Sequence, residues 1–317
     1  MPPFALITGV LAGCTSFRDC STEPTALVGE LPSSLGQTAL YSDIQGDVLN
    51  PDAIAFTPRF PLWTDGASKA RWIVLPEGTQ VDTSDPEQWR FPVGTQLFKE
   101  FTRDGVRVET RLNLKTADGW IGIAYLWSAD QSDASPQHEP LADASGTQHD
   151  VPGQQECAAC HGGRESFTLG FSQTQLELSL RQELYDRGLL SDPVEAEPTV
   201  SDAALAGLGV LHGNCSHCHN SSRHEQAQAT DCFAPGDFEP LDLSLPGGLE
   251  TLAQSPALQT ARWQLGDPGD SEVLRRMSER NLSERTPSMP PLGTELVDQD
   301  GIAKVQALLA ELEAQGL

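Results

Sequence analysis

Long apolar runs are absent from this chain of 317 residues, and no stretch reaches the roughly 18 consecutive apolar residues that a membrane-spanning helix needs. We therefore do not expect an integral membrane protein. Basic residues are also scarce, since 20 Lys and Arg stand against 45 Asp and Glu and give a formal net charge of -25. A surface of this sign repels polyanions, so we expect no nucleic-acid partner, although the charge could equally serve solubility alone.

The N-terminus carries an apolar run over residues 4–10, followed by Leu11-Ala12-Gly13-Cys14. Small residues directly before a cysteine resemble the lipobox of bacterial lipoproteins, which implies a lipid anchor on Cys14. The pattern departs from that of a signal peptide in one respect, because no Lys or Arg precedes Arg18. We expect residues 1–14 to be a lipoprotein signal segment; the alternative is an ordinary apolar segment with a buried cysteine.

Residues 15–40 are rich in Ser, Thr, Pro and Gly without periodicity, which predicts a tether. Residues 41–150 have the pattern of a β-rich domain. Apolar side chains alternate with charged or polar ones over residues 106–115, and Asp104-Gly105 and Asp118-Gly119 flank this run as turn signals. With residues 96–102 and 120–127, they predict an antiparallel meander.

Five of the six tryptophans fall between Trp63 and Trp127, and we expect them to pack in the core of this domain. No constellation of catalytic residue types stands out there. Residues 129–156 are polar and are predicted to be a linker or long loop.

Helical periodicity dominates the second half of the chain. Leucines recur every four residues at Leu176, Leu180 and Leu184, Ser201 or Asp202 is a candidate N-cap, and residues 302–312 have an amphipathic pattern. We therefore predict an α+β, multidomain protein: an antiparallel β-rich domain, a segment over residues 151–198 with the first of two cysteine motifs, and a mainly α-helical region over residues 199–317 with the second.

Two cysteine motifs carry the chemistry of this sequence. Two cysteines separated by two residues can form thioethers with both vinyl groups of one haem, and the histidine that follows can bind the iron. Zinc sites usually place their second ligand pair a dozen or more residues away, and a thioredoxin-like pair needs no matching histidine. We therefore predict two covalently bound haem c groups, at Cys157-Ala158-Ala159-Cys160-His161 and Cys215-Ser216-His217-Cys218-His219.

His161 and His219 are the predicted proximal iron ligands. A thioether sulfur opposite His raises the potential of a haem, and the chain has only Met1, Met277 and Met289. Met289 precedes two prolines that stiffen its loop, so we predict it as the distal ligand of the second haem. Met277 lies in a helical pattern with apolar neighbours and fits core packing better.

The sixth ligand of the first haem stays open. The iron could also lack a sixth ligand, which would decide between a carrier and an enzyme. The side chains that could supply the ligand are those of His138, His149, His212, His224 and Met277.

Two further cysteines, Cys20 and Cys232, are left after haem attachment and lipidation. They could form a disulfide in an oxidising compartment, but the sequence does not show that they approach each other.

The chain resembles a family of bacterial di-haem c-type cytochrome lipoproteins that have an N-terminal β-rich domain and a C-terminal cytochrome c-like domain. The likeness covers most of residues 41–312. The haem motifs are specific to haem attachment, whereas the other shared sequence segments identify a family without identifying a reaction. These segments are Phe60-Pro61-Leu62-Trp63-Thr64-Asp65-Gly66-Ala67, Phe91-Pro92-Val93-Gly94-Thr95, Glu109-Thr110-Arg111-Leu112, Gly119-Trp120, Asn214-Cys215, Gly266-Asp267-Pro268-Gly269-Asp270-Ser271 and Met289-Pro290-Pro291-Leu292-Gly293.

The resemblance implies electron transfer between redox partner proteins of the cell envelope. Because Thr15 follows the cysteine, we expect the lipid anchor in the outer membrane, with the folded part facing the periplasm or the cell surface. The alternative is a di-haem peroxidase or a related haem oxidoreductase, whose first iron has an open face. The short segment between Cys157 and Cys215 leaves little chain for a distal pocket and favours the carrier. In a third interpretation, the β-rich half docks the haem half to a partner enzyme.

Overall fold

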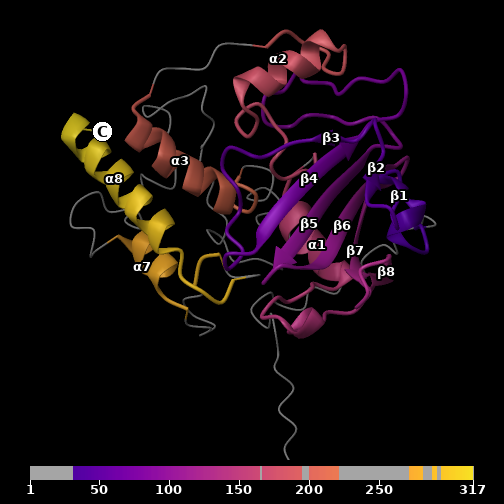
Figure 1. The fold of residues 1–317 in the computed structure, drawn as a ribbon. Helices are drawn as coiled ribbons and strands as arrows, with labels where there is room; N and C mark the ends of the chain where they lie inside the picture. Colours follow the sequence, from indigo (N-terminus) through magenta and orange to yellow (C-terminus); the bar gives the residue numbers. More distant parts are fainter. Residues whose placement is uncertain are drawn as a thin grey trace, which may run out of the picture.

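A computed structural model gives the fold, and it is mixed α+β with strands preceding most of the helices. Figure 1 shows a central sheet with one group of helices beside it. No helix within the described ranges is both long and apolar enough to cross a membrane. The structure describes residues 31–164, 166–194, 200–220, 271–280, 288–290 and 294–316.

The main sheet is antiparallel, with the strand order β3-β4-β5-β6-β7-β8, so each strand pairs with its neighbour in sequence. A separate pair is formed by β1 (Tyr41–Asp43) and β2 (Val48–Leu49). The strands of the main sheet are β3 (Ile54–Ala55), β4 (Ser68–Val74), β5 (Gln96–Arg103), β6 (Val106–Thr116), β7 (Gly119–Trp127) and β8 (Ala134–Gln137).

The predicted meander is confirmed by β5, β6 and β7, whose bounds differ from the expected ones by one residue at most. Asp104 and Gly105 both have positive φ angles, of 51° and 80°, as the tight turn between β5 and β6 requires. Alternation along the chain was sufficient to identify these strands because each of them buries one apolar face.

That apolar face forms a core with side chains from every central strand, among them Phe98, Leu112 and Tyr125. Leu35 and Leu40 are fully buried in the same core. The prediction of a tether is therefore wrong for residues 31–40, because two leucines among the small residues suffice to hold this segment against the sheet. Residues 15–30 lie outside the described part of the chain.

The prediction of a linker over residues 129–156 is also wrong in part. Residues 134–137 form β8, which pairs with β7 and completes the sheet. Pro136 disguises the strand in the sequence, and it is tolerated because β8 is an edge strand with free space for a residue that lacks a backbone donor.

The predicted packing of the tryptophans is confirmed for Trp89, Trp120 and Trp127, which are 7% exposed or less. Trp63 and Trp72 are half-buried.

The helices include α1 (Gln154–His161), α2 (Leu178–Asp186), α3 (Asp202–Asn214), α7 (Glu272–Ser278) and α8 (Gln299–Gln315). The predicted helices are confirmed by α2, α3, α7 and α8, although Leu176 of the predicted leucine pattern precedes α2. Ser201 is the N-cap of α3, and its hydroxyl accepts a hydrogen bond from the backbone N–H of Ala204.

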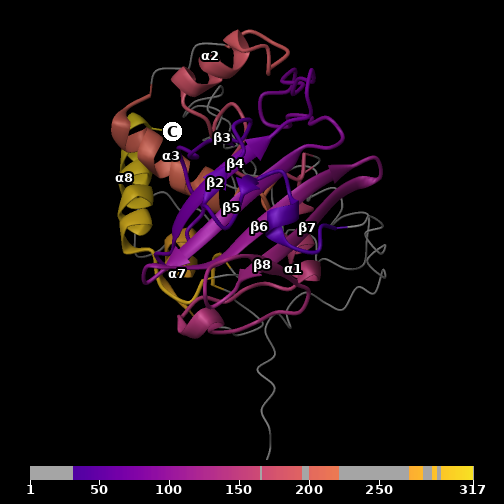
Figure 2. The same cartoon turned by 45° about the vertical axis from the view of Figure 1, so that its right-hand side comes forward.

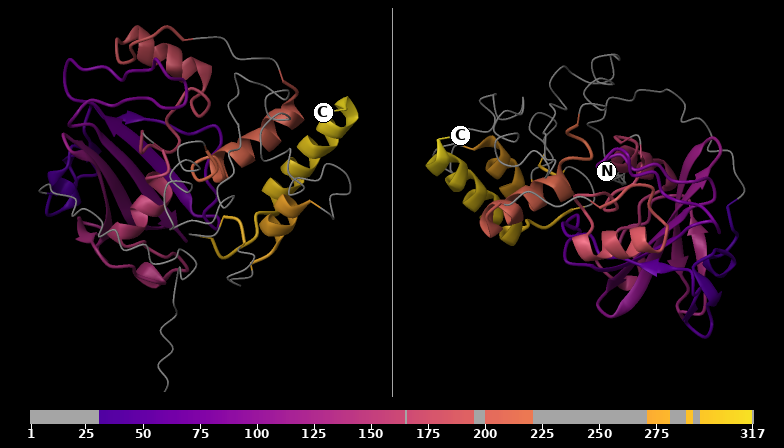
Figure 3. Two further views of the ribbon diagram at one scale, coloured as in Figure 1. Left: turned by 180° about the vertical axis from the view of Figure 1, so that it is seen from behind. Right: turned by 90° about the horizontal axis from the view of Figure 1, so that it is seen from above.

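Helices α3, α7 and α8 share a core of their own, which includes Leu208, Leu211, Met277, Val305 and Leu308. Figure 2 shows α3 and α8 side by side. Seen from above in Figure 3, this group lies to one side of the sheet.

The group is joined to the sheet by the segment before β4. Gly209 and Gly213 of α3 let Phe60 approach the helix closely: a Cβ at Gly209 would overlap the Phe60 ring, and one at Gly213 would lie 2.5 Å from the Phe60 carbonyl oxygen. Trp63 donates its backbone N–H to the Asn214 side chain at 2.8 Å. Asp65 accepts hydrogen bonds from the backbone N–H groups of Glu295 and Leu296, at 2.7 and 3.0 Å.

We expect Gly209→Ala to lower the free energy of unfolding by about 2 kcal/mol, because the added methyl collides with the Phe60 ring. Without this collision, alanine would stabilise the helix relative to glycine by about 1 kcal/mol, so the sign of the change in unfolding free energy shows whether the collision occurs. Urea unfolding of Gly209→Ala, of Phe60→Ala and of the double variant measures the effect. The same substitution should cost less in the Phe60→Ala background, and a stabilising Gly209→Ala would contradict the close approach.

Candidate functional site

The first cysteine motif lies on α1, which packs against β7 on the face of the sheet opposite Phe98 and Tyr125. Figure 3 shows α1 across the sheet in the view from behind. The contact needs Gly122 of β7, since a Cβ there would lie 3.0 Å from the Cys157 Cβ and 3.1 Å from the Asn113 Oδ1. The absence of a side chain at residue 122 therefore positions Cys157 on the sheet.

His161, the last residue of α1, has one ring nitrogen engaged with the backbone. Its Nδ1 lies 2.8 Å from the Phe167 carbonyl oxygen. A carbonyl oxygen only accepts, whereas the Asn113 amide group, 3.3 Å from the same nitrogen, can present either its nitrogen or its oxygen, so Nδ1 carries the proton and Nε2 keeps a lone pair. Phe167 has a left-handed φ of 54°, and its ring lies between His161, at 5.1 Å, and Trp120, at 6.3 Å. This arrangement fixes the tautomer that a metal-binding histidine needs.

Burial controls the protonation of this motif. It lowers the pKa of His161 to about 4, so the ring is neutral at pH 7. It also raises the pKa of the Cys157 thiol. No disulfide joins Cys157, Cys160, Cys215 and Cys218 to one another.

The second motif begins where α3 ends. Backbone hydrogen bonds from Cys218 and His219 to the Cys215 carbonyl, at 3.1 and 2.9 Å, continue the chain in a tight turn. Cys215 packs against the core of the C-terminal helices, and burial raises its pKa to about 12. The turn brings both cysteines and His219 to one end of α3.

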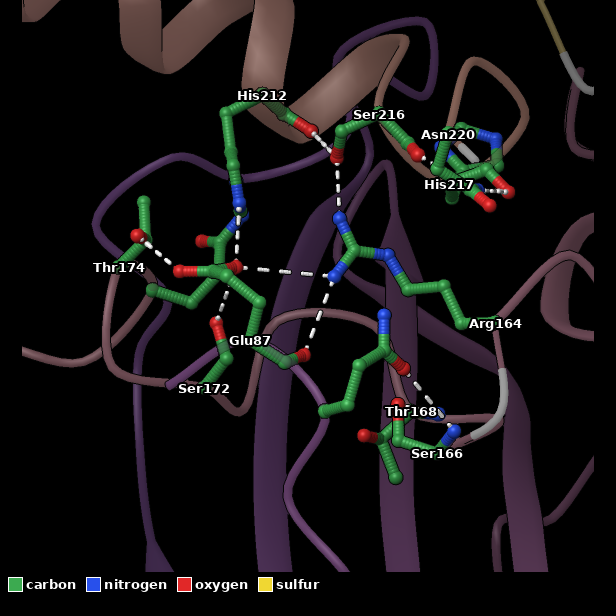
Figure 4. A network of polar contacts seen from close by, with 12 residues as sticks. Glu87, Arg164, Ser166, Thr168, Ser172, Thr174, His212, Ser216, His217 and Asn220 are labelled. Atoms are coloured by element: carbon green, nitrogen blue, oxygen red, sulfur yellow. Dashed lines mark hydrogen bonds and ion pairs between the residues drawn. The ribbon is translucent and has the colours of Figure 1, made fainter. Parts of the chain in front are cut away.

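One side chain bridges the two motifs. Arg164, three residues after His161, donates from Nη2 to the Ser216 hydroxyl at 2.6 Å, and this hydroxyl donates to the His212 carbonyl, also at 2.6 Å. Figure 4 shows Arg164 reaching from the first segment to the second. The structure thus places together two motifs that the sequence shows only as separate.

Glu87, which sequence analysis did not single out, supports the bridge. Its carboxylate lies 3.7 Å from Arg164 Nη1 and 3.0 Å from His212 Nε2, and it accepts a hydrogen bond from Thr174 (Figure 4). Burial by itself would raise the pKa of Glu87, but the hydrogen bond from His212 and the charge of Arg164 hold it below its ordinary value. The carboxylate is therefore ionised at neutral pH.

His212, a candidate sixth ligand, has both ring nitrogens occupied. Gln175 accepts the Phe60 N–H with Oε1, so its Nε2 donates to His212 Nδ1 at 2.8 Å, and His212 Nε2–H donates to Glu87. His149, another candidate, holds Glu109 Oε1 with Nε2 at 2.8 Å. His212 therefore offers no unoccupied nitrogen, and His149 could bind a metal through Nε2 only if it gave up Glu109.

The remaining candidate sixth ligands lie in different surroundings. His138 is exposed and lies 3.2 Å from Gln154 Oε1 through Nδ1. Met277 is 8% exposed within the core of α3, α7 and α8, as expected for a packing residue. His224 lies outside the described residues, and so do Cys14, Cys20 and Cys232.

Met289, the predicted distal ligand of the second haem, is half-buried after α7. Its backbone N–H donates to the Arg276 carbonyl at 3.0 Å, and its carbonyl accepts from Arg280 Nη1 at 3.3 Å. These bonds tie its backbone to α7 and leave the sulfur uncommitted by any hydrogen bond that the structure shows.

A row of cations crosses the sheet next to α1, and sequence analysis missed it. Arg71, Lys99 and Arg111 are directly opposite one another on β4, β5 and β6. Directly paired residues project from the same face, which is the face that carries α1. The alternation over residues 106–115 indicated a charged face, but the register that aligns these three strands is not visible in the sequence.

The residues present fit haem at both motifs. Each motif offers two cysteine thiols and an adjacent histidine, and at the first motif the lone pair of His161 Nε2 would be the one to hold an iron. The buried Nε of Arg164, between the motifs, has no hydrogen-bond partner within the described ranges and could serve a carboxylate. Those ranges contain no group of three or more His, Cys, Asp or Glu that could hold a metal ion by itself.

No family model matches the chain, and neither the curated proteins nor the solved structures contain a match.

We expect Glu87→Gln to lower the free energy of unfolding at pH 7 by about 2 kcal/mol, because Arg164 and His212 lose their buried anion. The folded-state pKa of Glu87 lies below its ordinary 4.5, so its contribution is present above pH 4.5 and is lost as the pH falls through the lower folded-state value. The difference between wild type and variant should shrink accordingly. Urea unfolding between pH 7 and 3 measures it.

Glu183→Gln is the matched control, since Glu183 forms an exposed ion pair with Arg187 and should change stability by less than about 0.5 kcal/mol. Equal effects of the two substitutions would show that Glu87 does not hold the bridge.

Proposed function

We propose that this chain is a di-haem c-type cytochrome that transfers electrons in the bacterial cell envelope. Cys157 and Cys160 would attach one haem and Cys215 and Cys218 the other, with His161 and His219 as proximal ligands. The observation that carries the proposal is the bond from His161 Nδ1 to the Phe167 carbonyl, because it leaves Nε2 as the only ligand nitrogen in a motif that already fits haem.

The bridge between the motifs supports a carrier. When bound, each haem supplies an iron that gains and loses one electron. Arg164 keeps the segment after His161 against Ser216, so the two attachment points lie within reach of one arginine side chain. Ser166 and Thr168 on one side of the bridge, and Ser216 and His217 on the other, are buried.

We propose the C-terminal part, with α3, α7 and α8, as a cytochrome c-like domain. Its support is the placement of the second motif at the end of α3 and the shared core of the three helices. The net charge of -25 favours redox partners with a basic or neutral contact surface.

A di-haem peroxidase or a related haem oxidoreductase is the second candidate. It is favoured by the engagement of both His212 ring nitrogens with Gln175 and Glu87, which withholds this histidine from the first iron. A five-coordinate first haem would bind small ligands.

Electron paramagnetic resonance of the oxidised protein, together with a peroxide turnover assay, separates the two functions. The carrier predicts two low-spin, six-coordinate haems and no turnover. A high-spin haem that consumes peroxide would replace the carrier by the peroxidase, and a protein without any haem signal would reject both.

Met289 should be the distal ligand of the second haem. We expect Met289→Ala to remove one Met-ligated signature from the optical spectrum and to lower the potential of that haem, with little effect on the fold. Met277→Leu, which conserves volume in the helical core, is the control and should leave the spectrum unchanged. If Met289→Ala has the wild-type spectrum and potential, Met289 only packs.

We further propose that Cys14 anchors the chain by a lipid to the outer membrane. The support is the apolar run and small residues that precede it. Cys14→Ser should move the protein from the membrane fraction to the soluble fraction. Recovery of wild type only in the soluble fraction, without bound lipid, would remove the anchor from the proposal.

A further inference from the structure

Among the described residues, a single carboxylate, that of Glu109, faces the cationic row beside α1. The row consists of Arg71, Lys99 and Arg111 in direct cross-strand register, with Lys69 two residues before Arg71 on the same strand and face. Arg71 is 7% exposed, and the other three side chains are half-buried. Four cations on one covered face are unexpected in a chain with 45 acidic residues.

Only Arg111 has a carboxylate partner among the described residues. Glu109 pairs with it through two bonds, Nε to Oε2 at 3.0 Å and Nη2 to Oε1 at 2.5 Å, and His149 also contacts this carboxylate. One carboxylate is thus already shared between Arg111 and His149. It leaves no charge to balance the rest of the row.

Lys69, Lys99 and Arg71 are not balanced in this way. Lys69 donates to the Leu62 carbonyl, and the Lys99 ammonium lies 4.7 Å from the centre of the Phe101 ring. For Arg71, the described part of the chain offers no hydrogen-bond or ion-pair partner to the guanidinium. An arginine cannot give up its proton, so a buried guanidinium needs an anion from elsewhere.

The pKa values of these groups agree with a missing anion. Burial lowers the pKa of Lys69 to about 7 and that of Arg71 to about 10. Burial, followed by the charges of Arg111, Arg71 and Lys69, lowers the pKa of Lys99 well below its ordinary value. A bound carboxylate would reverse these shifts, because it favours the charged forms.

The row is aligned with the first cysteine motif. Arg111 lies two residues before Asn113 and on the same face of β6. Asn113 is paired with Gly122, against which Cys157 packs, and its side chain lies 3.3 Å from the His161 ring. From Arg111 the row continues over β5 to β4, about 10 Å across the sheet at the usual spacing of strands. The row therefore begins at the motif and leads away from it.

We propose that Arg71, Lys99 and Lys69 form a binding site for carboxylates beside the first cysteine motif. This inference rests on the proposed function in one respect: the carboxylates can belong to the haem attached at Cys157 and Cys160, which carries two propionates. The same three cationic side chains would also bind a free dicarboxylate. The site is distinct from the attachment and ligand residues, and it gives the charged face of the sheet a function.

The sign of a stability change tests the site. Arg71→Met with Lys99→Met keeps the apolar length of both side chains and removes both charges. If carboxylates occupy the site, the double variant leaves them unpaired, and the Tm of the purified holoprotein should fall by roughly 5 °C. If the cations are unpaired, their removal should raise the Tm, because two desolvated charges are replaced by apolar groups. A higher or unchanged Tm overturns the proposal.

The matched control is Arg187→Met with Lys304→Met, which removes one arginine and one lysine from exposed ion pairs. Its Tm should remain within about 1 °C of wild type. A control that falls as far as the test variant would also overturn the site, because net charge alone would then explain the loss.

Succinate, compared with NaCl at equal ionic strength, identifies the source of the carboxylates. With haem propionates in the site, the Tm of wild type does not respond to succinate; with an exchangeable anion, it rises to saturation in wild type and not in the double variant. Haem content, measured by absorbance, separates this proposal from the proposed function. A haem-free protein with the succinate response keeps the carboxylate site and rejects the cytochrome. A haem-loaded protein whose double variant has a higher Tm keeps the cytochrome and rejects the site.

Discussion

The hydrogen bond between Arg164 and Ser216 joins the two halves of the molecule beside the two cysteine motifs. Arg164 belongs to the segment that follows α1, and Ser216 is within the second cysteine motif. Glu87 supplies the anion that makes burial of this arginine tolerable, and His212 of α3 is oriented by the same carboxylate. A segment before the first motif, the chain between the two motifs and the second motif itself thus converge on one buried charge pair, and their relative position depends on it.

The main sheet uses its two faces for different purposes. One face packs against its own apolar core and provides stability, with Phe98, Leu112 and Tyr125 fully or almost fully buried. The other face carries α1 at Gly122 and, one step along the strands, a row of cations. Consecutive strands pair throughout the main sheet, and short turns join β5 to β6 and β6 to β7. The β-rich domain thus carries the first cysteine motif on one face of its sheet.

The fold was predictable from the sequence where local patterns decide it. Alternation and turn signals gave β5 to β7, the N-cap at Ser201 gave α3, and apolar periodicity gave α8. Pattern reasoning failed where a few residues override composition: Leu35 and Leu40 bury a segment that has the composition of a tether, and Pro136 conceals an edge strand.

Of the candidate site, only the two cysteine motifs were predictable from the sequence. Cysteine spacing named the motifs, but Glu87, Arg164 and Arg71 act through partners that are distant in the chain. Their pairing is set by strand register and by the packing of α3, which no local signal encodes. The candidate sixth ligands show the same limit, since the sequence lists His149 and His212 but not the carboxylates that already bind them.

The central claim is that both cysteine motifs carry covalent haem. Intact mass spectrometry of the purified protein, followed by peptide mapping, tests it most directly. The account predicts a mass that exceeds the processed polypeptide by two haems, one on the peptide with Cys157 and Cys160 and one on the peptide with Cys215 and Cys218. A gain of one haem or of none would contradict it.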